Sequence, residues 1–182
     1  QYMQVTLPIK LPFILHGRGA LGHLKSFPEK NILIVTDAVG RKLFGAKLTE
    51  YLEGKEVTFF DEVEPNPKLS IMNRAGELAR SIQPELIIGI GGGSALDTAT
   101  AAYFLCGQPA MKLTEMQYYV DYGLAKKSKL VQIPTTSGTG SESSAGCVFT
   151  VDSTGVKIDV LSADLIPAAI IVDPELTLSM PR

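Results

Sequence analysis

Cysteine and histidine are scarce in this chain, and their scarcity excludes several kinds of site. The two cysteines among 182 residues, Cys106 and Cys147, are too few for a disulfide scaffold. Free thiols fit the reducing cytoplasm, where we expect the protein to reside, and such residues usually pack in the core. The two histidines, His16 and His23, are separated by a turn signal, so we assign no metal ligand to this chain.

Positive charge and long apolar runs are also lacking. The net charge is −2, from 17 Lys and Arg against 19 Asp and Glu, whereas a protein that binds nucleic acid needs a basic face for the phosphates. No apolar run approaches the ~18 residues that cross a bilayer. The amino terminus shows no charged segment followed by an apolar one, as a secretory leader would. We therefore expect neither a nucleic-acid nor a membrane partner.

What the chain does contain is an alternation of apolar strands and amphipathic helices. Strands separated by helices favour right-handed crossovers and a parallel sheet, so the expected fold class is α/β, a Rossmann-like parallel sheet with flanking helices. The turn signal Asp-Ser-Thr-Gly at 152–155 predicts an additional β-hairpin. The expected strands are 31–36, 56–60, 86–90, 129–133, 147–151, 156–160 and 168–172, and the expected helices 40–53, 69–82 and 94–106. The apolar face of the first helix is expected on Leu43, Phe44, Ala46, Leu48, Tyr51 and Leu52.

Three consecutive glycines, Gly91, Gly92 and Gly93, follow the third expected strand. Without a β-carbon they let another group approach the backbone, and they permit positive φ. The helix that follows offers unpaired N–H groups and the positive end of its dipole, which together favour a phosphate. Ser94 is expected to cap this helix, with Asp97 in a variant of the capping box. The pattern indicates a phosphate-binding turn; the alternative is a turn that needs glycine only for its conformation.

Polar residues follow two other expected strands. Asp37 comes directly after the first strand, and the segment Pro134–Glu142 (PTTSGTGSE) follows the fourth. Ligands of open parallel sheets bind beyond the carboxyl ends of the strands. We therefore expect Asp37, the three glycines and this segment to meet at one edge of the sheet. The segment is rich in serine, yet no G-x-S-x-G elbow is present, which argues against a hydrolase.

A second glycine motif competes with the first. Residues 17–22 (GRGALG) form a literal G-x-G-x-x-G, and Asp37 lies 20 residues beyond Gly17, where a dinucleotide fold places its ribose-binding acid. The segment His23–Phe27, which precedes a proline, is too short for the crossover helix of such a unit. We therefore favour the glycines at 91–93, and the alternative for 17–22 is a turn at the start of the domain.

The chain resembles the iron-containing alcohol dehydrogenases at three motifs that occur in the order expected for that family. They are Gly91–Asp97 (GGGSALD), Pro134–Glu142 (PTTSGTGSE) and Val172–Thr177 (VDPELT), with weaker matches at Phe13–Leu21, Asp37 and Asn66-Pro67. The resemblance implies that residues 1–182 form one dinucleotide-binding domain. It also implies that the family's carboxyl-terminal helical domain, which binds the metal, is missing from this chain.

The resemblance further implies roles for individual residues in binding a nicotinamide dinucleotide. The pyrophosphate would rest on Gly92, Gly93 and Ser94, and Gly91 would belong to the same cofactor-binding turn. Asp97 and Lys157 would lie at the nicotinamide ribose, although Lys157 is otherwise read as an exposed lysine of the hairpin. The family usually has lysine where this chain has Thr100, so one positive charge near the expected helix is lost.

At the adenosine end, the resemblance implies a groove lined by three hydroxyls and one apolar side chain, those of Thr135, Thr136, Thr139 and Leu176. Without a ligand, such threonines would bond their own backbone. Asp37 would accept hydrogen bonds from the ribose diol. Its charge would repel the extra phosphate of NADP, so NAD is favoured. Arg41, close to Asp37 in sequence, leaves NADP as an alternative.

The family binds divalent iron, sometimes zinc, through one Asp and three His of the helical half. The resemblance therefore implies the NAD(P)-binding half of a metal-dependent dehydrogenase that interconverts an alcohol and an aldehyde or ketone, with a homodimer as the expected assembly. We expect this chain alone to bind the dinucleotide without turnover. The alternative is a stand-alone nucleotide-binding or regulatory protein without catalysis.

Overall fold

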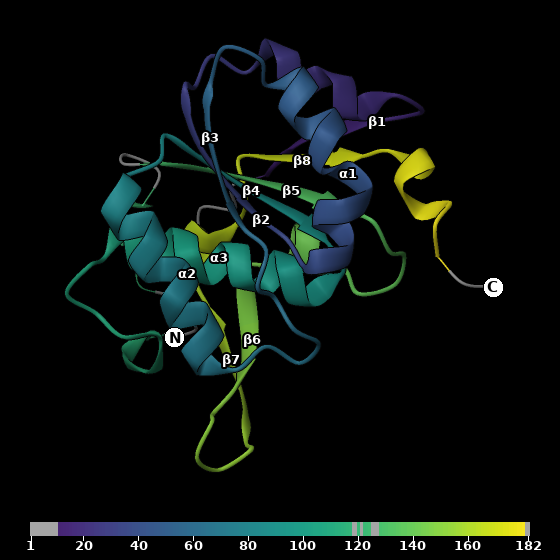
Figure 1. Ribbon diagram of the computed structural model, residues 1–182. Coiled ribbons are helices and arrows are strands. Elements are labelled where there is room, and N and C mark those ends of the chain that lie inside the picture. Colours follow the sequence, from purple (N-terminus) through teal and green to yellow (C-terminus); the bar gives the residue numbers. More distant parts are fainter. Residues whose placement is uncertain (1–10, 118–119, 121, 125–127, 181–182) are drawn as a thin grey trace, which may run out of the picture.

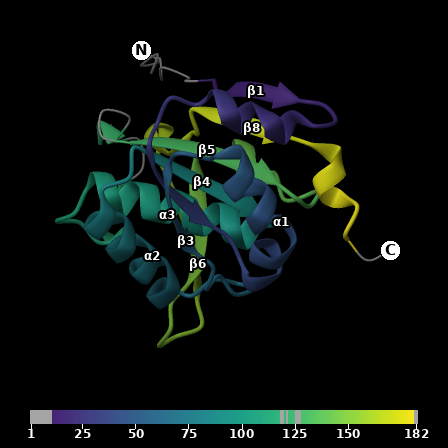
Figure 2. The same cartoon turned by 45° about the horizontal axis from the view of Figure 1, so that its top comes forward.

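The computed structural model describes residues 11–117, 120, 122–124 and 128–180 of the 182. A six-stranded sheet lies at its centre, with all strands parallel and in the order β1-β8-β5-β4-β2-β3. Helix α1 covers one face, and α2 with α3 covers the other (Figures 1 and 2). The predicted α/β fold with a parallel sheet is confirmed. The ends of the expected domain, residues 1–10 and 181–182, lie outside the described residues.

The element bounds follow the sequence pattern closely. The strands of the sheet are β1 (Phe13–His16), β2 (Asn31–Val35), β3 (Glu56–Phe60), β4 (Leu86–Gly91), β5 (Lys129–Pro134) and β8 (Ala169–Val172). The helices are α1 (Ala38–Tyr51), α2 (Leu69–Ile82) and α3 (Gly93–Gly107). A separate antiparallel hairpin consists of β6 (Gly146–Thr150) and β7 (Lys157–Leu161). Short 3₁₀ turns are η1 (Ala20–Ser26), η2 (Leu113–Glu115), η4 (Ser141–Ser143), η5 (Ala163–Leu165) and η6 (Pro174–Thr177).

Two apolar cores pack against the two faces of the sheet. Successive residues of a strand point to opposite faces, so in β2 Ile32 and Ile34 join the core beneath α1, whereas Leu33 and Val35 join the core beneath α2 and α3. Both faces are covered, which is why these strands read as continuous apolar runs. Among the described helices, none is long and apolar enough to span a membrane.

Helix α1 buries less of its predicted apolar face than expected. Leu48 is buried, but Leu43 is 49% exposed. Ala46 is exposed as well. Leu52 is buried, and Phe44 and Tyr51 are partly buried against the core. The expectation was therefore wrong for Leu43 and Ala46 and is confirmed for the other four residues of the predicted face.

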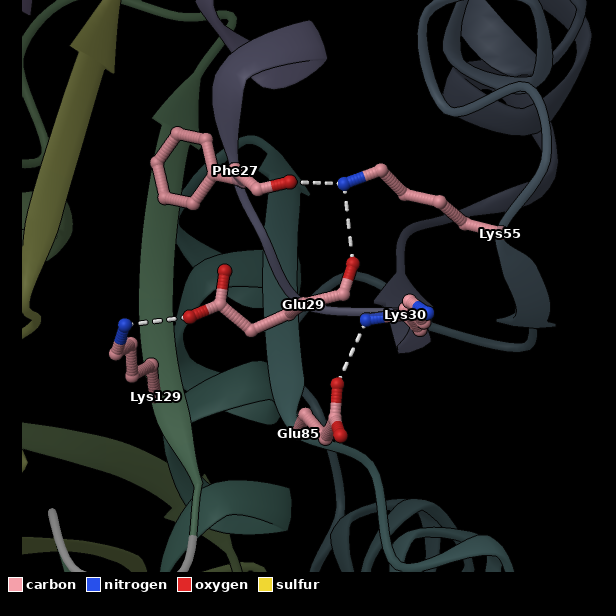
Figure 3. A network of polar contacts seen from close by, with 6 residues as sticks. All are labelled: Phe27, Glu29, Lys30, Lys55, Glu85 and Lys129. Atoms are coloured by element: carbon pink, nitrogen blue, oxygen red, sulfur yellow. Dashed lines mark hydrogen bonds and ion pairs between the residues drawn. The ribbon is translucent and has the colours of Figure 1, made fainter.

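A polar network ties together the amino-terminal ends of the strands (Figure 3). Lys129, the first residue of β5, places Nζ 2.5 Å from Oε1 of the largely buried Glu29. Lys55 Nζ donates to the Glu29 carbonyl at 3.0 Å, and the Lys30 N–H donates to Glu85 Oε2 at 2.6 Å. This last bond lowers the pKa of Glu85. The network lies at the edge of the sheet opposite the three glycines, so it stabilises the fold away from the candidate site.

Candidate coenzyme-binding site

The three glycines lie where the carboxyl ends of the central strands meet. β4 ends at Gly91, its neighbour β5 ends at Pro134, and the Thr135 N–H donates to the Gly91 carbonyl at 3.0 Å. β2, which is followed by Asp37, pairs with the other side of β4. The predicted meeting of these segments at one edge of the sheet is confirmed.

Each glycine meets a different steric demand. Gly91 has φ +146°, and a β-carbon there would lie 2.8 Å from that of Ala95. At Gly93 it would lie 3.1 Å from Ser141 Oγ, closer than ordinary packing. At Gly92 the nearest atoms belong to Thr136 at 3.6 Å, an ordinary van der Waals distance. The fold therefore requires glycine at 91 and favours it at 93, whereas at 92 the fold leaves room for a side chain.

The start of α3 differs from the prediction. The N-cap residue is Gly92, not Ser94, and among the described residues no side chain caps the helix. Ser94 lies inside the first turn of α3, so the capping box does not form. The Asp97 carboxylate instead accepts a hydrogen bond from the Val148 N–H at 3.2 Å. An uncapped first turn presents its N–H groups to a ligand.

A cavity of about 270 Å³ opens beside this helix end, between the sheet edge and the hairpin. The predicted residues that line it are Gly93, Ser94, Asp97, Thr139 and Lys157; the others are Asn66, Pro67, Ser141, Val148, Phe149 and Thr150. The structure thus brings together residues that are up to 91 positions apart, such as Asn66 and Lys157, whose Oδ1 and Nζ lie 2.8 Å apart.

The hairpin wall of the cavity is fastened to the segment before α2. The Thr150 N–H donates to the Pro67 carbonyl at 2.9 Å, and Asp152 accepts from the N–H and the hydroxyl of Ser70 at 3.0 and 2.5 Å. The sequence predicts the hairpin, with Lys157 on it, and Asn66-Pro67 is a weak family match, but the bonds between these two segments were not predicted. No local pattern links these segments, because they meet only through tertiary contacts.

Asp97 is the titratable group that the cavity perturbs. Burial raises its pKa to about 6, against the opposing effect of hydrogen bonds from Val148 and Ser141. At neutral pH the carboxylate is ionised in a partly apolar site. It can then accept hydrogen bonds from a ligand, at some cost to the stability of the chain.

We expect Asp97→Asn to stabilise the chain above pH 7 by about 1–3 kcal/mol and to have little effect near pH 4. The folded state raises the pKa of Asp97 above its unfolded value of about 4, so the wild-type chain loses stability as pH rises from about 4 to about 6. Asparagine carries no charge and still accepts from the Val148 N–H. Urea unfolding across this pH range measures the difference, and a difference independent of pH would contradict the account.

The residues predicted for the adenosine end are more scattered. Asp37 caps α1, with Oδ1 accepting from the Gly40 N–H at 2.6 Å. Thr135 and Thr136 follow β5 directly beside the glycines. Leu176 is only 3% exposed and packs in the core with residues of η1, so it offers little surface to a ligand. Its predicted contact stays a prediction.

In the competing motif at residues 17–22, backbone N–H groups already bind a carboxylate of this same chain. The buried Asp173 carboxylate accepts from the N–H groups of Gly19 and Leu21 at 3.2 and 3.1 Å, and from that of Glu175 at 3.1 Å. A short 3₁₀ turn, η1, follows in place of a long α-helix. The alternative that we kept open, a turn at the start of the domain, describes this segment.

Comparison with known proteins gives the family. The family model for iron-containing alcohol dehydrogenase matches residues 12–174. The chain belongs to this family. It is 33% identical to the NADPH-dependent butanol dehydrogenase of Clostridium saccharobutylicum, over 98% of this chain and 47% of that protein. Its fold is similar to a solved 1,3-propanediol oxidoreductase, with TM-score 0.85, 28% identity and coverage of 97% and 48%.

A third relative was solved with a dinucleotide. It is the sulfoacetaldehyde reductase from Bifidobacterium kashiwanohense in complex with NAD⁺, with TM-score 0.83, 27% identity and coverage of 97% of this chain and 49% of that one. The chain thus spans about half the length of the relatives it matches. It corresponds to the amino-terminal part of the family.

The described residues of this chain do not fit a metal ion. In that part of the chain, no group of three or more His, Cys, Asp or Glu side chains is placed to hold one. His16 ends β1 and His23 lies in η1. No step of the chemistry is therefore assigned to a metal held by these residues.

Thr100, at the position where the family usually has lysine, lies outside the cavity. It is 2% exposed, and its hydroxyl receives a hydrogen bond from Gln132 Nε2 at 2.9 Å between α3 and β5. The side chain at this position faces the sheet, so in this chain it serves the packing of α3.

Proposed function

We propose that this chain binds NAD and supplies the coenzyme half of a metal-dependent alcohol dehydrogenase. The N–H groups of Gly92, Gly93 and Ser94 would donate to the diphosphate. The observation that carries the proposal is the start of α3, where no side chain caps the helix and a cavity of about 270 Å³ lies alongside. The N-cap residue is Gly92, although the fold itself has room there for a β-carbon. Backbone N–H groups and the helix dipole both favour an anion there.

The cavity next to this helix end would receive the nicotinamide half. Asp97, ionised above about pH 6, would accept hydrogen bonds from the ribose hydroxyls. Lys157, held at the cavity wall by Asn66, would donate to the same ribose. Val148 and Phe149 give the cavity an apolar side, which would exclude water from the ring. When bound, the coenzyme supplies a carbon that accepts or donates hydride.

The adenosine half would extend from the glycines toward β2. Thr135, Thr136 and Thr139 would line this groove with hydroxyls. Asp37 Oδ1 is engaged by the Gly40 N–H, and Oδ2 would accept from the ribose diol. A carboxylate in this position favours NAD over NADP, because the additional phosphate would meet a like charge.

The reaction of the whole protein would be the interconversion of an alcohol and an aldehyde or ketone. Family membership and the length of the relatives support this, since the chain spans about half of each. Divalent iron or zinc would be held outside this chain, so residues 1–182 would form a dinucleotide-binding domain without turnover of its own. Assembly as a homodimer is part of the same proposal.

Titration of the 182-residue chain with NADH, followed by nucleotide fluorescence, tests the binding step. We expect saturable binding of one NADH per chain, and competition by ADP-ribose. Incubation with NAD and a primary alcohol should give no NADH above the blank. Absence of NADH binding would overturn the coenzyme site, and turnover by the chain alone would overturn the placement of the metal outside it.

A further inference from the structure

Arg41 is the cation closest in sequence to Asp37, but among the described residues it forms no ion pair with that carboxylate. Asp37 caps the start of α1, one turn before Arg41, whereas the Arg41 side chain runs over Gly45, one turn after it. A β-carbon at Gly45 would lie 3.3 Å from Arg41 Nη1 and 3.4 Å from Cδ. The Arg41 side chain therefore packs along α1 beside Gly45.

Two residues at the end of the edge strand hold the guanidinium there. Its central carbon lies 3.4 Å from the centre of the Phe59 ring, a cation–π arrangement. Arg41 Nε lies 3.9 Å from Asp61 Oδ2, and Asp61 directly follows β3. Among the described residues, Arg41 forms an ion pair with Asp61 and not with Asp37. β3 pairs with β2, so Phe59 and Asp61 lie beside the carboxyl end of β2, which Asp37 follows.

This arrangement bears on which dinucleotide the site accepts. A 2′-phosphate at the end of β2 needs a nearby cation, commonly an arginine. Here Arg41, the arginine nearest to Asp37 in sequence, is engaged by Phe59 and Asp61. NADPH would have to compete with Asp61 for Arg41, whereas NADH would not need Arg41 at all.

Resting on the proposed function, we infer that Asp61 is a coenzyme-specificity residue: it retains Arg41 on Phe59 and thereby disfavours the 2′-phosphate of NADP(H). Asp61 acts through Arg41 and does not itself touch the nucleotide. Both side chains are partly exposed, by 41% for Arg41 and 46% for Asp61. Exposed pairs are weak, and without the Asp61 charge only the contact with Phe59 holds Arg41 in place, so Arg41 moves more easily toward a 2′-phosphate.

Dissociation constants of NADH and NADPH for four variants of the 182-residue chain test this inference at low salt. Asp61→Asn should tighten NADPH binding by about 3- to 10-fold and change NADH binding by less than about twofold. Arg41→Ala alone should alter both by less than about twofold, since the wild-type site does not use Arg41. The double variant Arg41→Ala/Asp61→Asn should lose the NADPH gain. Glu64→Gln, with the same charge change in the same exposed loop, is the matched control and should leave the NADPH/NADH ratio unchanged.

Three results would overturn the inference while NADH binding stays intact: an unchanged ratio in Asp61→Asn, a gain that survives removal of Arg41, or an equal gain in Glu64→Gln. The second and third would mean that simple loss of negative charge accounts for the effect. If the wild-type chain bound neither nucleotide, the coenzyme site itself would be overturned, and the inference with it.

Discussion

Alanine at position 92 is expected to weaken NADH binding by about 10- to 100-fold, that is about 1.4–2.8 kcal/mol, without unfolding the chain. Gly92 caps α3 in an extended conformation, φ −77° and ψ −179°, that alanine adopts without strain. The added methyl would meet Thr136 at an ordinary 3.6 Å. It would also occupy the surface that a diphosphate must approach, and so lengthen the hydrogen bonds from the helix N–H groups. NADH titration together with a thermal melt measures both effects.

The chain offers a matched control in its other glycine motif. Gly22→Ala adds the same methyl in η1, where no atom lies within 4 Å and φ is not positive. NADH affinity should change by less than about twofold in this variant. If Gly22→Ala weakened binding as much as Gly92→Ala, or if Gly92→Ala had no effect, the diphosphate would not rest on α3.

Loss of the Asp173 carboxylate should be the most destabilising single change considered for this chain. Asp173→Ala is expected to lower the free energy of unfolding by about 3–5 kcal/mol, because it leaves without an acceptor the N–H groups that now donate to the buried carboxylate. Three N–H groups depend on it, those of Gly19, Leu21 and Glu175. Through them Asp173 joins the end of β8 to the turn after β1. Urea unfolding monitored by circular dichroism gives the change.

Two further variants locate the cause of this effect. Asp173→Asn keeps one acceptor oxygen and should recover part of the loss. Glu175→Ala removes an exposed carboxylate two residues away and should shift stability by no more than about 0.5 kcal/mol. Equal losses in Asp173→Ala and Glu175→Ala would show that the bonds to Gly19 and Leu21 carry no stability.

Where the apolar pattern alone determines an element, prediction and structure agree. β3 at Glu56–Phe60 and α2 at Leu69–Ile82 have the predicted bounds, because each has a distinct apolar period and ends at turn residues. β1 was not predicted, and among the described strands it pairs with β8 alone, 156 residues later. It is an edge strand of the described sheet, and consecutive residues, Phe13 and Ile14, are 67% and 56% exposed. Its sequence therefore shows no clear alternation of apolar and polar residues.

The position of the candidate site in the fold could be predicted from the sequence, but its individual contacts could not. The common edge for Asp37, the glycines and the segment after Pro134 follows from strand direction alone. The cap of α3 was wrongly assigned to Ser94, because side-chain preference for N-caps says nothing about the Val148 N–H that engages Asp97 instead. Likewise, only the folded chain reveals that Asp173 fills the competing motif. In each case a contact between distant residues decided the outcome.

A crystal structure of the chain with NAD bound tests the central claim most directly. The account predicts diphosphate oxygens within hydrogen-bond distance of the N–H groups of Gly92, Gly93 and Ser94, with Asp173 still bonded to Gly19 and Leu21. A diphosphate seated on residues 17–22 with Asp173 displaced would contradict it.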